Sequence, residues 1–371
     1  MELYDRITNF LVGEYIGHSV QKKQLRCLRL VSPPFNRSAT RILLCHISIT
    51  MRHLRDYMHP MRRRRAKGPR FIFDSDFCDF VRVLAIRSHP VRGRIFVERW
   101  LDDEVEGKAY ENFLYFLSRI PSVERIHINS DCYNYEYLLV NSMFKSFRHA
   151  QLPQLKTLKI HGLDPRGNQS AGLSPALDDV LQELLPQLRI LNLRYDGHPS
   201  LDKAKFHVFH FLHLGRGLRS VNLDGLGRPP KYPCPMHEPV HPFLHPCASI
   251  ERISLSGIMI PYEMLATICN YRKSLVYLHL TCVYLLTGTW ADFCQELGEC
   301  PNLKTAIISW RCGYYYRVPG QNTYYCSLEL SASDTAAMTL LRRKAKSVRR
   351  ARGEKTPELV PRHDWDDENV N

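Results

Sequence analysis

Two stretches, PQLKTLKIHG at 153–162 and PQLRILNLRYDG at 186–197, carry the same arrangement of apolar residues. In each stretch an apolar residue is followed three positions later by a second and two positions after that by a third. The last two alternate with polar residues, as they do in a β-strand that buries one face. Each stretch is therefore predicted to contain a half-buried strand.

The same triplet recurs along most of the 371-residue chain. From Val123 the successive starts are 32, 33, 30, 32, 25 and 28 residues apart, a period typical of stacked supersecondary units. The triplets are Val81/Leu84/Ile86, Val123/Ile126/Ile128, Leu155/Leu158/Ile160, Leu188/Leu191/Leu193, Leu218/Val221/Leu223, Ile250/Ile253/Leu255, Leu275/Leu278/Leu280 and Leu303/Ala306/Ile308. Candidates to extend the series at its two ends are Leu44/Ile47/Ile49 and Tyr325/Leu328/Leu330.

The segments between these strands have helical patterns. SPALDDVLQELLP at 174–186 and PYEMLATICNYRKS at 261–274 place apolar residues three and four apart and begin near Ser or Pro, which are helix-start signals. This alternation predicts an α/β fold, a curved solenoid with a parallel sheet on the concave side and helices on the convex side. The solenoid is expected to span residues 46–333, with inserted loops near 58–70 and 226–247.

The pattern resembles leucine-rich repeats in a degenerate form. It departs from them in one respect, because the asparagine that usually follows the LxxLxL core is missing. Residues between and beside the buried pair of each strand point to the concave surface, where a protein target is expected to bind. The candidate target contacts are Lys159, Asn192, Asn222, Ser254, Tyr277 and His279.

The first 45 residues predict three short helices that lead into the first strand. An apolar stripe is formed by Leu3, Ile7, Phe10 and Leu11 in the first helix and by Leu25, Leu28 and Val31 in the second. The third helix and the strand come from PPFNRSATRILLCHISI at 33–49. A segment this small buries too little surface to be comfortably stable alone, so it packs on the repeats or on a partner.

The phrase LRLVSPPFNRSAT at 28–40 resembles the fungal form of the F-box, in which it leads into the first strand of a repeat array. The Leu-Pro that normally opens that motif is absent. The resemblance implies that residues 1–45 bind a Skp-type adaptor and, through it, a cullin-based ubiquitin ligase. The expected adaptor contacts are Leu3, Ile7, Phe10, Leu11, Leu28, Val31 and Phe35.

The net charge of +14 is concentrated in two basic runs, MRRRRAK at 61–67 and LRRKAKSVRRAR at 341–352. Their twelve cations leave +2 for the rest of the chain, whereas a nucleic-acid groove distributes cations over a folded face. The runs are read as solvated loop and tail charge or as nuclear-import signals, and a nucleic-acid partner is not expected. No apolar run is long enough to span a bilayer and no signal peptide is evident, so the expected location is cytoplasmic, nuclear or both.

Sequence motifs for catalysis are missing. The chain has no P-loop, GxGxxG, GxSxG, HExxH or CxxC, and its 12 cysteines are scattered, so we expect no enzyme activity, no cofactor and no disulfide framework. KYPCPMHEPVHPFLHPC at 231–247 gathers Cys234, His237, His241, His245 and Cys247. This stretch is either an irregular loop between two repeats or a zinc site, and no metal ligands are assigned.

The C-terminal part contains two further features. The Tyr-rich stretch CGYYYRVPGQNTYYCS, which begins at residue 312, either closes the apolar end of the solenoid or offers a binding surface. Residues 334–371 are predicted to form a terminal helix near 334–350 followed by a disordered charged tail.

These patterns predict a substrate receptor of an SCF-type ubiquitin ligase, in which the F-box-like segment binds the adaptor and the repeats bind an unidentified protein target. The alternative is a leucine-rich-repeat scaffold that acts outside ubiquitination and uses the helical segment as an N-terminal cap. A third reading is a nuclear protein that holds zinc or contacts nucleic acid through its basic runs.

Overall fold

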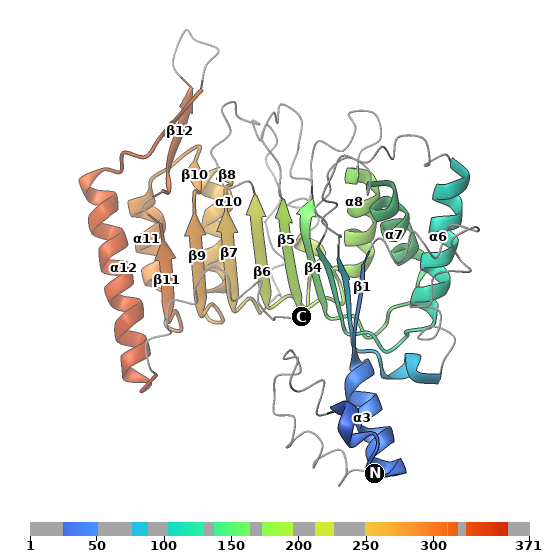
Figure 1. Ribbon diagram of the computed structural model, residues 1–371. Helices are drawn as coiled ribbons and strands as arrows, with labels where there is room; N and C mark the ends of the chain where they lie inside the picture. The colour runs from blue at the N-terminus through green and yellow to red at the C-terminus, as the bar shows by residue number, and fades with distance from the viewer. Residues whose placement is uncertain are drawn as a thin grey trace.

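The computed structural model of the chain describes residues 25–50, 76–87, 103–129, 137–163, 173–195, 212–225, 249–309, 311–317 and 324–354. Within these ranges the chain is a mixed α/β protein built on one long parallel sheet (Figure 1). The predicted loops near 58–70 and 226–247, the first predicted helix and the charged tail beyond residue 354 lie outside the described residues.

Nine strands form the main sheet in the order in which they occur along the chain. They are β1 (His46–Thr50), β2 (Val83–Arg87), β3 (Arg125–Asn129), β4 (Thr157–Leu163), β5 (Ile190–Tyr195), β6 (Ser220–Gly225), β7 (Arg252–Ser256), β9 (Tyr277–Thr281) and β11 (Thr305–Ile308). Every neighbouring pair is parallel. This confirms the mixed α/β class with a parallel sheet that the triplets predicted.

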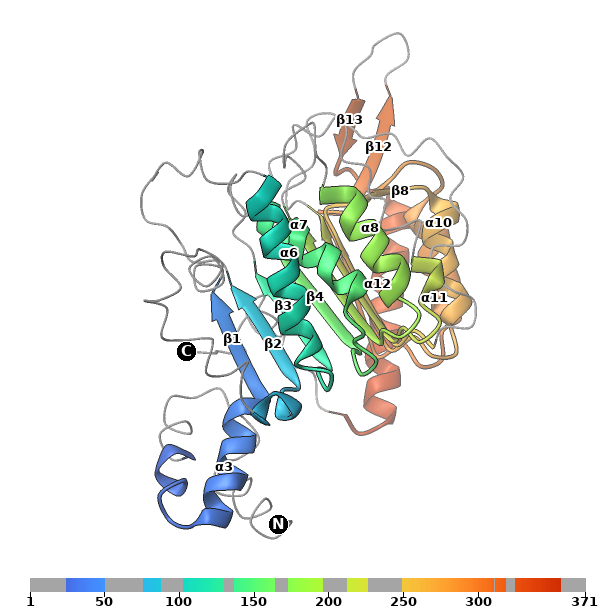
Figure 2. The ribbon, with the colours of Figure 1, turned by 90° about the vertical axis from the view of Figure 1, so that its right-hand side faces the viewer.

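The helices follow the strands and lie on one side of the sheet (Figures 1 and 2). They are α3 (Pro33–Cys45), α6 (Asp103–Ser118), α7 (Tyr137–His149), α8 (Leu173–Leu184), α10 (Tyr262–Ala266), α11 (Trp290–Gly298) and α12 (Ala332–Ala351), with 3₁₀ turns η1 (Asp76–Phe80), η2 (Leu212–Leu214) and η3 (Thr267–Tyr271). The exception is α3, which extends from the amino end of β1. The segment at 261–274, predicted as one helix, is divided between α10 and η3.

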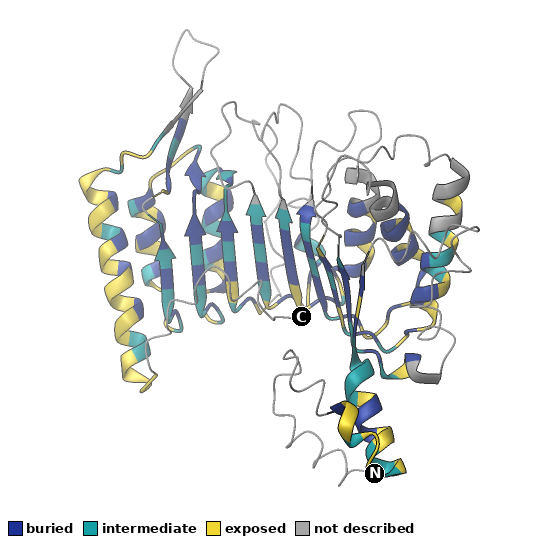
Figure 3. Ribbon diagram, in the orientation of Figure 1, coloured by how far each residue is buried: buried dark blue, intermediate teal, exposed yellow. Residues whose placement is uncertain are grey.

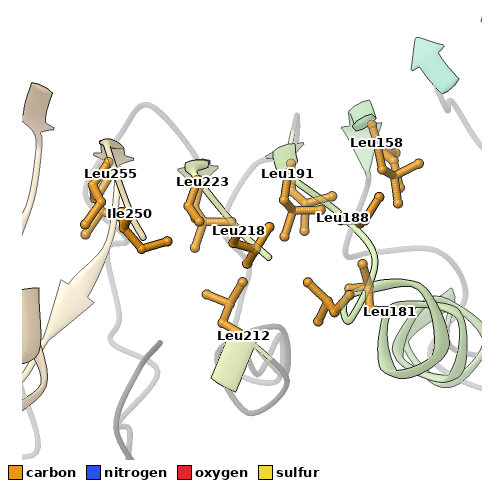
Figure 4. Close-up of a cluster of buried hydrophobic side chains, with 14 of the residues drawn as sticks. Leu158, Leu181, Leu188, Leu191, Leu212, Leu218, Leu223, Ile250 and Leu255 are labelled. Atoms are coloured by element: carbon orange, nitrogen blue, oxygen red, sulfur yellow. The ribbon is translucent and has the colours of Figure 1, made fainter. Parts of the chain in front are cut away.

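The core lies between the sheet and the helix layer. Each strand contributes two buried side chains, and the register places them in two continuous rows across the sheet, as Figure 3 shows by colour. The first triplet residue is buried as well: Leu188, Leu218 and Ile250 lie beside their strand partners in Figure 4. Leu181 of α8 and Leu212 of η2 reach the same layer from the helical side. Burying each such side chain stabilises the fold by roughly 1.5–3 kcal/mol.

The two rows face the helices from all nine strands. The first row consists of Ile47, Leu84, Ile126, Leu158, Leu191, Val221, Ile253, Leu278 and Ala306; the second consists of Ile49, Ile86, Ile128, Ile160, Leu193, Leu223, Leu255, Leu280 and Ile308. In the extension at Leu44/Ile47/Ile49, Ile47 and Ile49 therefore belong to the sheet in β1, whereas Leu44 lies in α3 and is half-buried.

The extension at Tyr325/Leu328/Leu330 is wrong. Tyr325 lies in β13 (Tyr324–Ser327), which pairs antiparallel with β12 (Gly313–Arg317) in a second, four-stranded sheet. The other two strands of that sheet are the short β8 (Met259–Ile260) and β10 (Tyr284–Leu285). Leu328 is 46% exposed rather than buried, so the main sheet ends at β11 among the described residues.

The last strand is covered by α12, which occupies the range where the sequence predicted a terminal helix. Its buried residues Met338, Leu341 and Ala345 recur at helical spacing and join the main core, while the opposite side of the helix is exposed (Figure 3). This helix packs against α11 and β11, so it shields the apolar end of the array from water.

Asp334 attaches the start of α12 to two other elements. Its carboxylate accepts hydrogen bonds from the backbone N–H of Ala291 at 2.9 Å, from the Tyr314 hydroxyl at 2.7 Å and from the Ser331 N–H at 3.0 Å. Ser331 and Asp334 also form a capping box, with the Asp334 N–H donating to the Ser331 hydroxyl. The Tyr-rich stretch thus helps to hold the closing helix through Tyr314.

We expect Asp334→Ala to lower the free energy of unfolding by about 3 kcal/mol, because three buried or half-buried donors lose a charged acceptor. Urea denaturation followed by tryptophan fluorescence is the measurement, since the buried Trp290 lies beside this network. The control is Thr339→Ala, an exposed position on the same helix. Equal losses in the two variants would show that the network contributes no stability of its own.

Candidate functional site

The face of the main sheet opposite the helices, called the open face below, displays outward side chains in rows. The in-register pairing of the strands aligns one residue of each strand across the whole sheet. The central row consists of Ser48, Ala85, His127, Lys159, Asn192, Asn222, Ser254, His279 and Ile307. The row on its amino side consists of His46, Val83, Arg125, Thr157, Ile190, Ser220, Arg252, Tyr277 and Thr305.

All six residues expected to contact a target lie together on the open face. Five belong to the central row, from Lys159 on β4 to His279 on β9, and Tyr277 lies in the row beside it. Asn192 differs from the others because it is only 4% exposed, and its Oδ1 accepts a hydrogen bond from Nδ2 of Asn222 at 3.0 Å. This side chain therefore links β5 to β6, while the other five remain partly exposed.

Cations gather on the β2–β5 part of the open face. Arg87, Arg125, Lys159 and Arg194 each project from a different strand, and we call these four residues the basic patch. The one acidic residue among the described outward positions of the sheet is Asp224, whose carboxylate lies 3.7 Å from Arg194. Among the described outward residues, this part of the open face therefore holds more cations than anions.

Acidic residues lie instead at the amino edge of the sheet, just before the strands. Glu124 approaches Arg82 at 3.9 Å and Lys156 at 4.0 Å. Glu251 approaches Arg219 at 3.5 Å. These partly exposed pairs contribute little stability, but they balance part of the charge at this edge of the sheet.

His127 lies in the middle of the basic patch. Burial, followed by the positive charges of Lys159, His46, His161 and Arg125, lowers the pKa of His127 from the ordinary 6.5 to about 3. Its Nε2 is shielded from solvent and has no hydrogen-bond partner among the described residues. The imidazole is therefore neutral at physiological pH.

The β7–β9 part of the open face has a different character. The rings of Tyr277 and His279 meet edge to face with centroids 6.4 Å apart, and His279 Nε2 lies 2.8 Å from the hydroxyl of Thr281. Burial raises the pKa of Tyr277, so its phenol stays protonated. This region offers aromatic and hydrogen-bonding contacts rather than charge.

The helical segment before β1 forms a second candidate surface. Residues 25–28 are helical, and Leu25 and Ala39 make a small buried cluster against which Leu28 packs. The α3 helix begins after Ser32, whose hydroxyl accepts the N–H of Phe35, and it continues directly into β1. This arrangement follows from the double proline, which is well tolerated in the first turn of a helix.

Two apolar side chains of this segment project into solvent. Leu30 is 88% exposed and Val31 is 64% exposed, while Phe35 is half-buried. Leu30 was not among the predicted adaptor contacts. The helix ends at Leu28, and the N–H groups of Leu30 and Val31 donate to carbonyls three residues earlier, so the 3.6-residue period stops here. The predicted contacts Leu3, Ile7, Phe10 and Leu11 lie outside the described residues.

The C-terminal basic run lies on α12 and its C-cap, and three of its cations contact β11, α11 and the turn between them. Arg342 donates to the carbonyl of Ile308, Lys344 donates to that of Gly298, and Arg352 donates to Oδ1 of Asn302. Arg343, Lys346 and Arg350 are exposed. The N-terminal basic run at 61–67 lies outside the described residues.

Described cysteines are thiols, several of them in the core. Burial raises the pKa of Cys294 and of Cys312 to about 12, so these thiols stay protonated. Among the residues placed by the structure, no group of three or more His, Cys, Asp or Glu side chains is arranged to hold a metal ion. The Cys/His-rich loop at 231–247 lies outside them.

No helix in the described part of the chain is both long enough and apolar enough to cross a membrane. No protein-family model and no curated protein sequence matches this chain.

The low pKa of His127 makes stability depend on pH. Between about pH 6.5 and about pH 3 the unfolded chain binds a proton at this position that the folded chain does not, so stability falls as the pH falls through this window. We expect His127→Gln to flatten the dependence of the unfolding free energy on pH, by at most about 1.4 kcal/mol per pH unit. Urea denaturation at a series of pH values measures it.

The matched control is His213→Gln on η2, away from the open face. A His127 variant whose stability changes with pH in parallel with the wild type would contradict the assignment.

Proposed function

We propose that this chain is a substrate-recognition subunit of a cullin-based, SCF-type ubiquitin ligase. In this proposal the helical segment before β1 binds a Skp-type adaptor, and the open face of the sheet binds a protein target. The observation that carries the proposal is the exposed apolar pair Leu30 and Val31, on a compact helical segment that runs without a linker into the first strand. Exposed apolar side chains on such a segment are typical of a partner surface.

We also infer the finer architecture as a degenerate leucine-rich-repeat-like solenoid preceded by an F-box-like segment. Support comes from one parallel strand per 25–33 residues from Val123 to β11, in chain order and with the helices on one side. The short helix at 25–28 and α3 are consistent with the second and third helices of the box.

The chain supplies recognition rather than chemistry in this proposal. The ligase contributes the reaction, and this subunit raises the effective concentration of the target at the reaction site. The helical segment around α3 projects beyond the amino end of β1 (Figure 1), so a target on the open face and an adaptor on this segment would contact different parts of the molecule.

The alternative is a repeat scaffold outside ubiquitination, with the helical segment as an N-terminal cap. A cap has to cover the apolar layer at the edge of the sheet, as α12 does at β11. In both views α3 instead projects beyond the amino end of β1, and its contacts beyond its own segment include η1, where Arg41 lies 5.2 Å from the ring centroid of Phe80. This placement favours a projecting module that meets a partner.

We expect the double variant Leu30→Arg/Val31→Arg to lose adaptor binding by well over tenfold. Each lost aliphatic contact costs about 1.5–3 kcal/mol, and about 1.4 kcal/mol corresponds to a factor of ten. Co-precipitation with the adaptor gives the affinity, and thermal unfolding checks the fold. The melting transition is expected to stay unchanged, because both side chains are already in solvent.

Leu340→Arg provides the matched control, since this leucine is 67% exposed on α12 at the far end of the sheet. Leu28→Arg provides a contrast: it disturbs the packing around Leu25 and lowers the melting temperature as well. The proposal would be contradicted by a wild-type chain that does not bind the adaptor, or by a double variant that binds it as well as the wild type.

Affinity purification with mass spectrometry separates the two candidate functions. A substrate receptor is expected to co-purify with an adaptor, a cullin and one further protein, and the double variant is expected to retain only the last. A scaffold would give the further protein without the first two in both cases.

A further inference from the structure

We propose that the exposed pair Leu30 and Val31 enters an apolar pocket of the adaptor, and that carboxylates border this pocket. These carboxylates pair with Arg26, Arg29 and Arg37, which are called the arginine rim below. The inference rests on the proposed function, because it takes the adaptor as the partner of the helical segment before β1. It goes further by naming the charge of the adaptor surface and by assigning a specific contact to Arg29.

The helical segment and β1 carry positive charge without any acidic residue. Residues 25–50 contain four arginines and neither Asp nor Glu. The three rim arginines are exposed, and none of them forms an ion pair with the residues that the structure describes, including Asp79 of the adjacent η1. The fourth, Arg41, lies over the ring of Phe80 and is therefore not counted in the rim. The rim is available to anionic groups of a partner.

Arg29 is held in place by neutral groups. Its Nε donates a hydrogen bond to Oδ1 of Asn36 at 3.1 Å, and the same oxygen accepts the hydroxyl of Thr40 at 3.2 Å. This bond orients the guanidinium and leaves its charge in place, because the amide and the hydroxyl carry none. A guanidinium has five N–H donors, of which this bond uses one. The remaining donors suit bidentate pairing with a carboxylate.

The backbone beside Arg29 is ordered as well. The N–H groups of residues 29, 30 and 31 donate to the carbonyls of residues 25, 27 and 28 at 3.2, 3.0 and 3.1 Å. The two exposed aliphatic side chains therefore project from a hydrogen-bonded turn. A partner does not have to order this turn on binding, which removes one of the entropic costs of association.

An apolar centre with a charged rim is the arrangement expected of a protein interface. The fully buried core of an interface is depleted in charged residues, while its rim is polar and stays in contact with water. Arginine is also among the residues that contribute most to binding energy. Because paired surfaces are electrostatically complementary, an aliphatic pair beside three cations predicts an apolar pocket beside anions on the other side.

A protein pocket fits this surface better than a membrane or a nucleic acid. Helices that lie in a membrane surface bury a whole apolar face with residues such as Trp, Phe and Leu, whereas the described part of this segment exposes two large aliphatic side chains. A phosphate backbone would pair with the arginines, but it offers no apolar pocket to Leu30 and Val31.

The test measures binding of the full chain to the purified Skp-type adaptor by biolayer interferometry, at low and at physiological salt. Wild-type binding is expected to weaken as salt rises. Replacing Arg26, Arg29 and Arg37 together by Gln is expected to weaken binding about tenfold or more, with slower association and a smaller dependence on salt. Circular dichroism checks the fold of the variant.

The matched control replaces Arg343, Lys346 and Arg350 of α12 by Gln. It removes the same charge from exposed positions at the other end of the sheet and is expected to change binding by less than about twofold. If the triple rim variant unfolds, the double variant Arg26→Gln/Arg37→Gln takes its place, because no hydrogen bond of either side chain is lost. It is expected to weaken binding about threefold or more.

Arg29→Lys tests the positioned guanidinium separately from its charge. Lysine keeps the positive charge but has no planar fork and no Nε donor for Asn36. We expect this variant to keep the salt dependence of the wild type and to dissociate several times faster. Dissociation at the wild-type rate would overturn the contact assigned to Arg29.

Three results would overturn the acidic border of the pocket. They are equal losses in the rim and α12 variants, a rim variant with the affinity and salt dependence of the wild type, and tighter rim-dependent binding to phosphatidylserine vesicles or to a DNA duplex than to the adaptor. The last result would assign the rim to lipid or nucleic-acid phosphates.

The inference and the proposed function fail in different ways. If Leu30→Arg/Val31→Arg abolishes adaptor binding and the rim variant does not weaken it, the ligase subunit stands and only the inference is overturned. A wild-type chain that does not bind the adaptor at either salt concentration overturns both.

Discussion

The structure depends on the alignment of two buried aliphatic rows across nine parallel strands. Each strand contributes two side chains to these rows, and neither row is complete within any single unit. A shift of one residue in any strand would turn its buried pair to the open face and its polar residues into the core, so the register is strongly specified. The same constraint organises the open face. Because the inward residues fix the register, the outward residues of neighbouring strands are also aligned in rows.

The inward pattern is the part of the fold that the sequence predicts well. Triplets such as Leu155/Leu158/Ile160 are sufficient to predict a strand and the side chains that it buries. The number of residues between successive triplets is enough for one helix between strands. The same pattern gives a wrong prediction at Tyr325/Leu328/Leu330, because a triplet contains no information on which strand is its neighbour in the sheet. There the chain forms a hairpin with β12, and the pairing is decided by tertiary contacts such as the one between Tyr314 and Asp334.

Left-handed backbone conformations recur just after the buried pair of three strands. Two residues beyond the last buried position of β4, β7 and β9, the backbone turns at Gly162, Gly257 and Cys282 with φ values of 80°, 65° and 53°. Glycine adopts this left-handed conformation without steric cost, whereas Cys282 adopts it at some expense. The chain thus adopts the same left-handed conformation at the equivalent position of three units, within β4 in the first and directly after β7 and β9 in the other two.

The basic patch shows why the sequence alone does not reveal a cluster of charges that the fold brings together. Its four cations are 38, 34 and 35 residues apart, one in each of four successive units, so none belongs to a basic run. The runs at 61–67 and 341–352 dominate the net charge, yet the sheet brings four cations together from parts of the sequence that look nearly neutral. The exposure of Leu30 was not predicted because the helical period gives the orientation of a side chain only while the helix continues, and the helix ends at Leu28.

The placement of the patch has a consequence for the proposed complex. The patch occupies β2–β5, next to β1, and β1 is the strand that α3 enters directly. In the proposed complex, a target bound over β2–β5 would be held at the end of the sheet nearest the helical segment before β1, whereas the aromatic region around Tyr277 lies several strands farther away. Charged contacts near one end of the sheet and aromatic, hydrogen-bonding contacts farther along it would give such a target a preferred direction on the open face. The charged contacts would orient the target, and the shape and hydrogen bonding of the β7–β9 region would select among candidates.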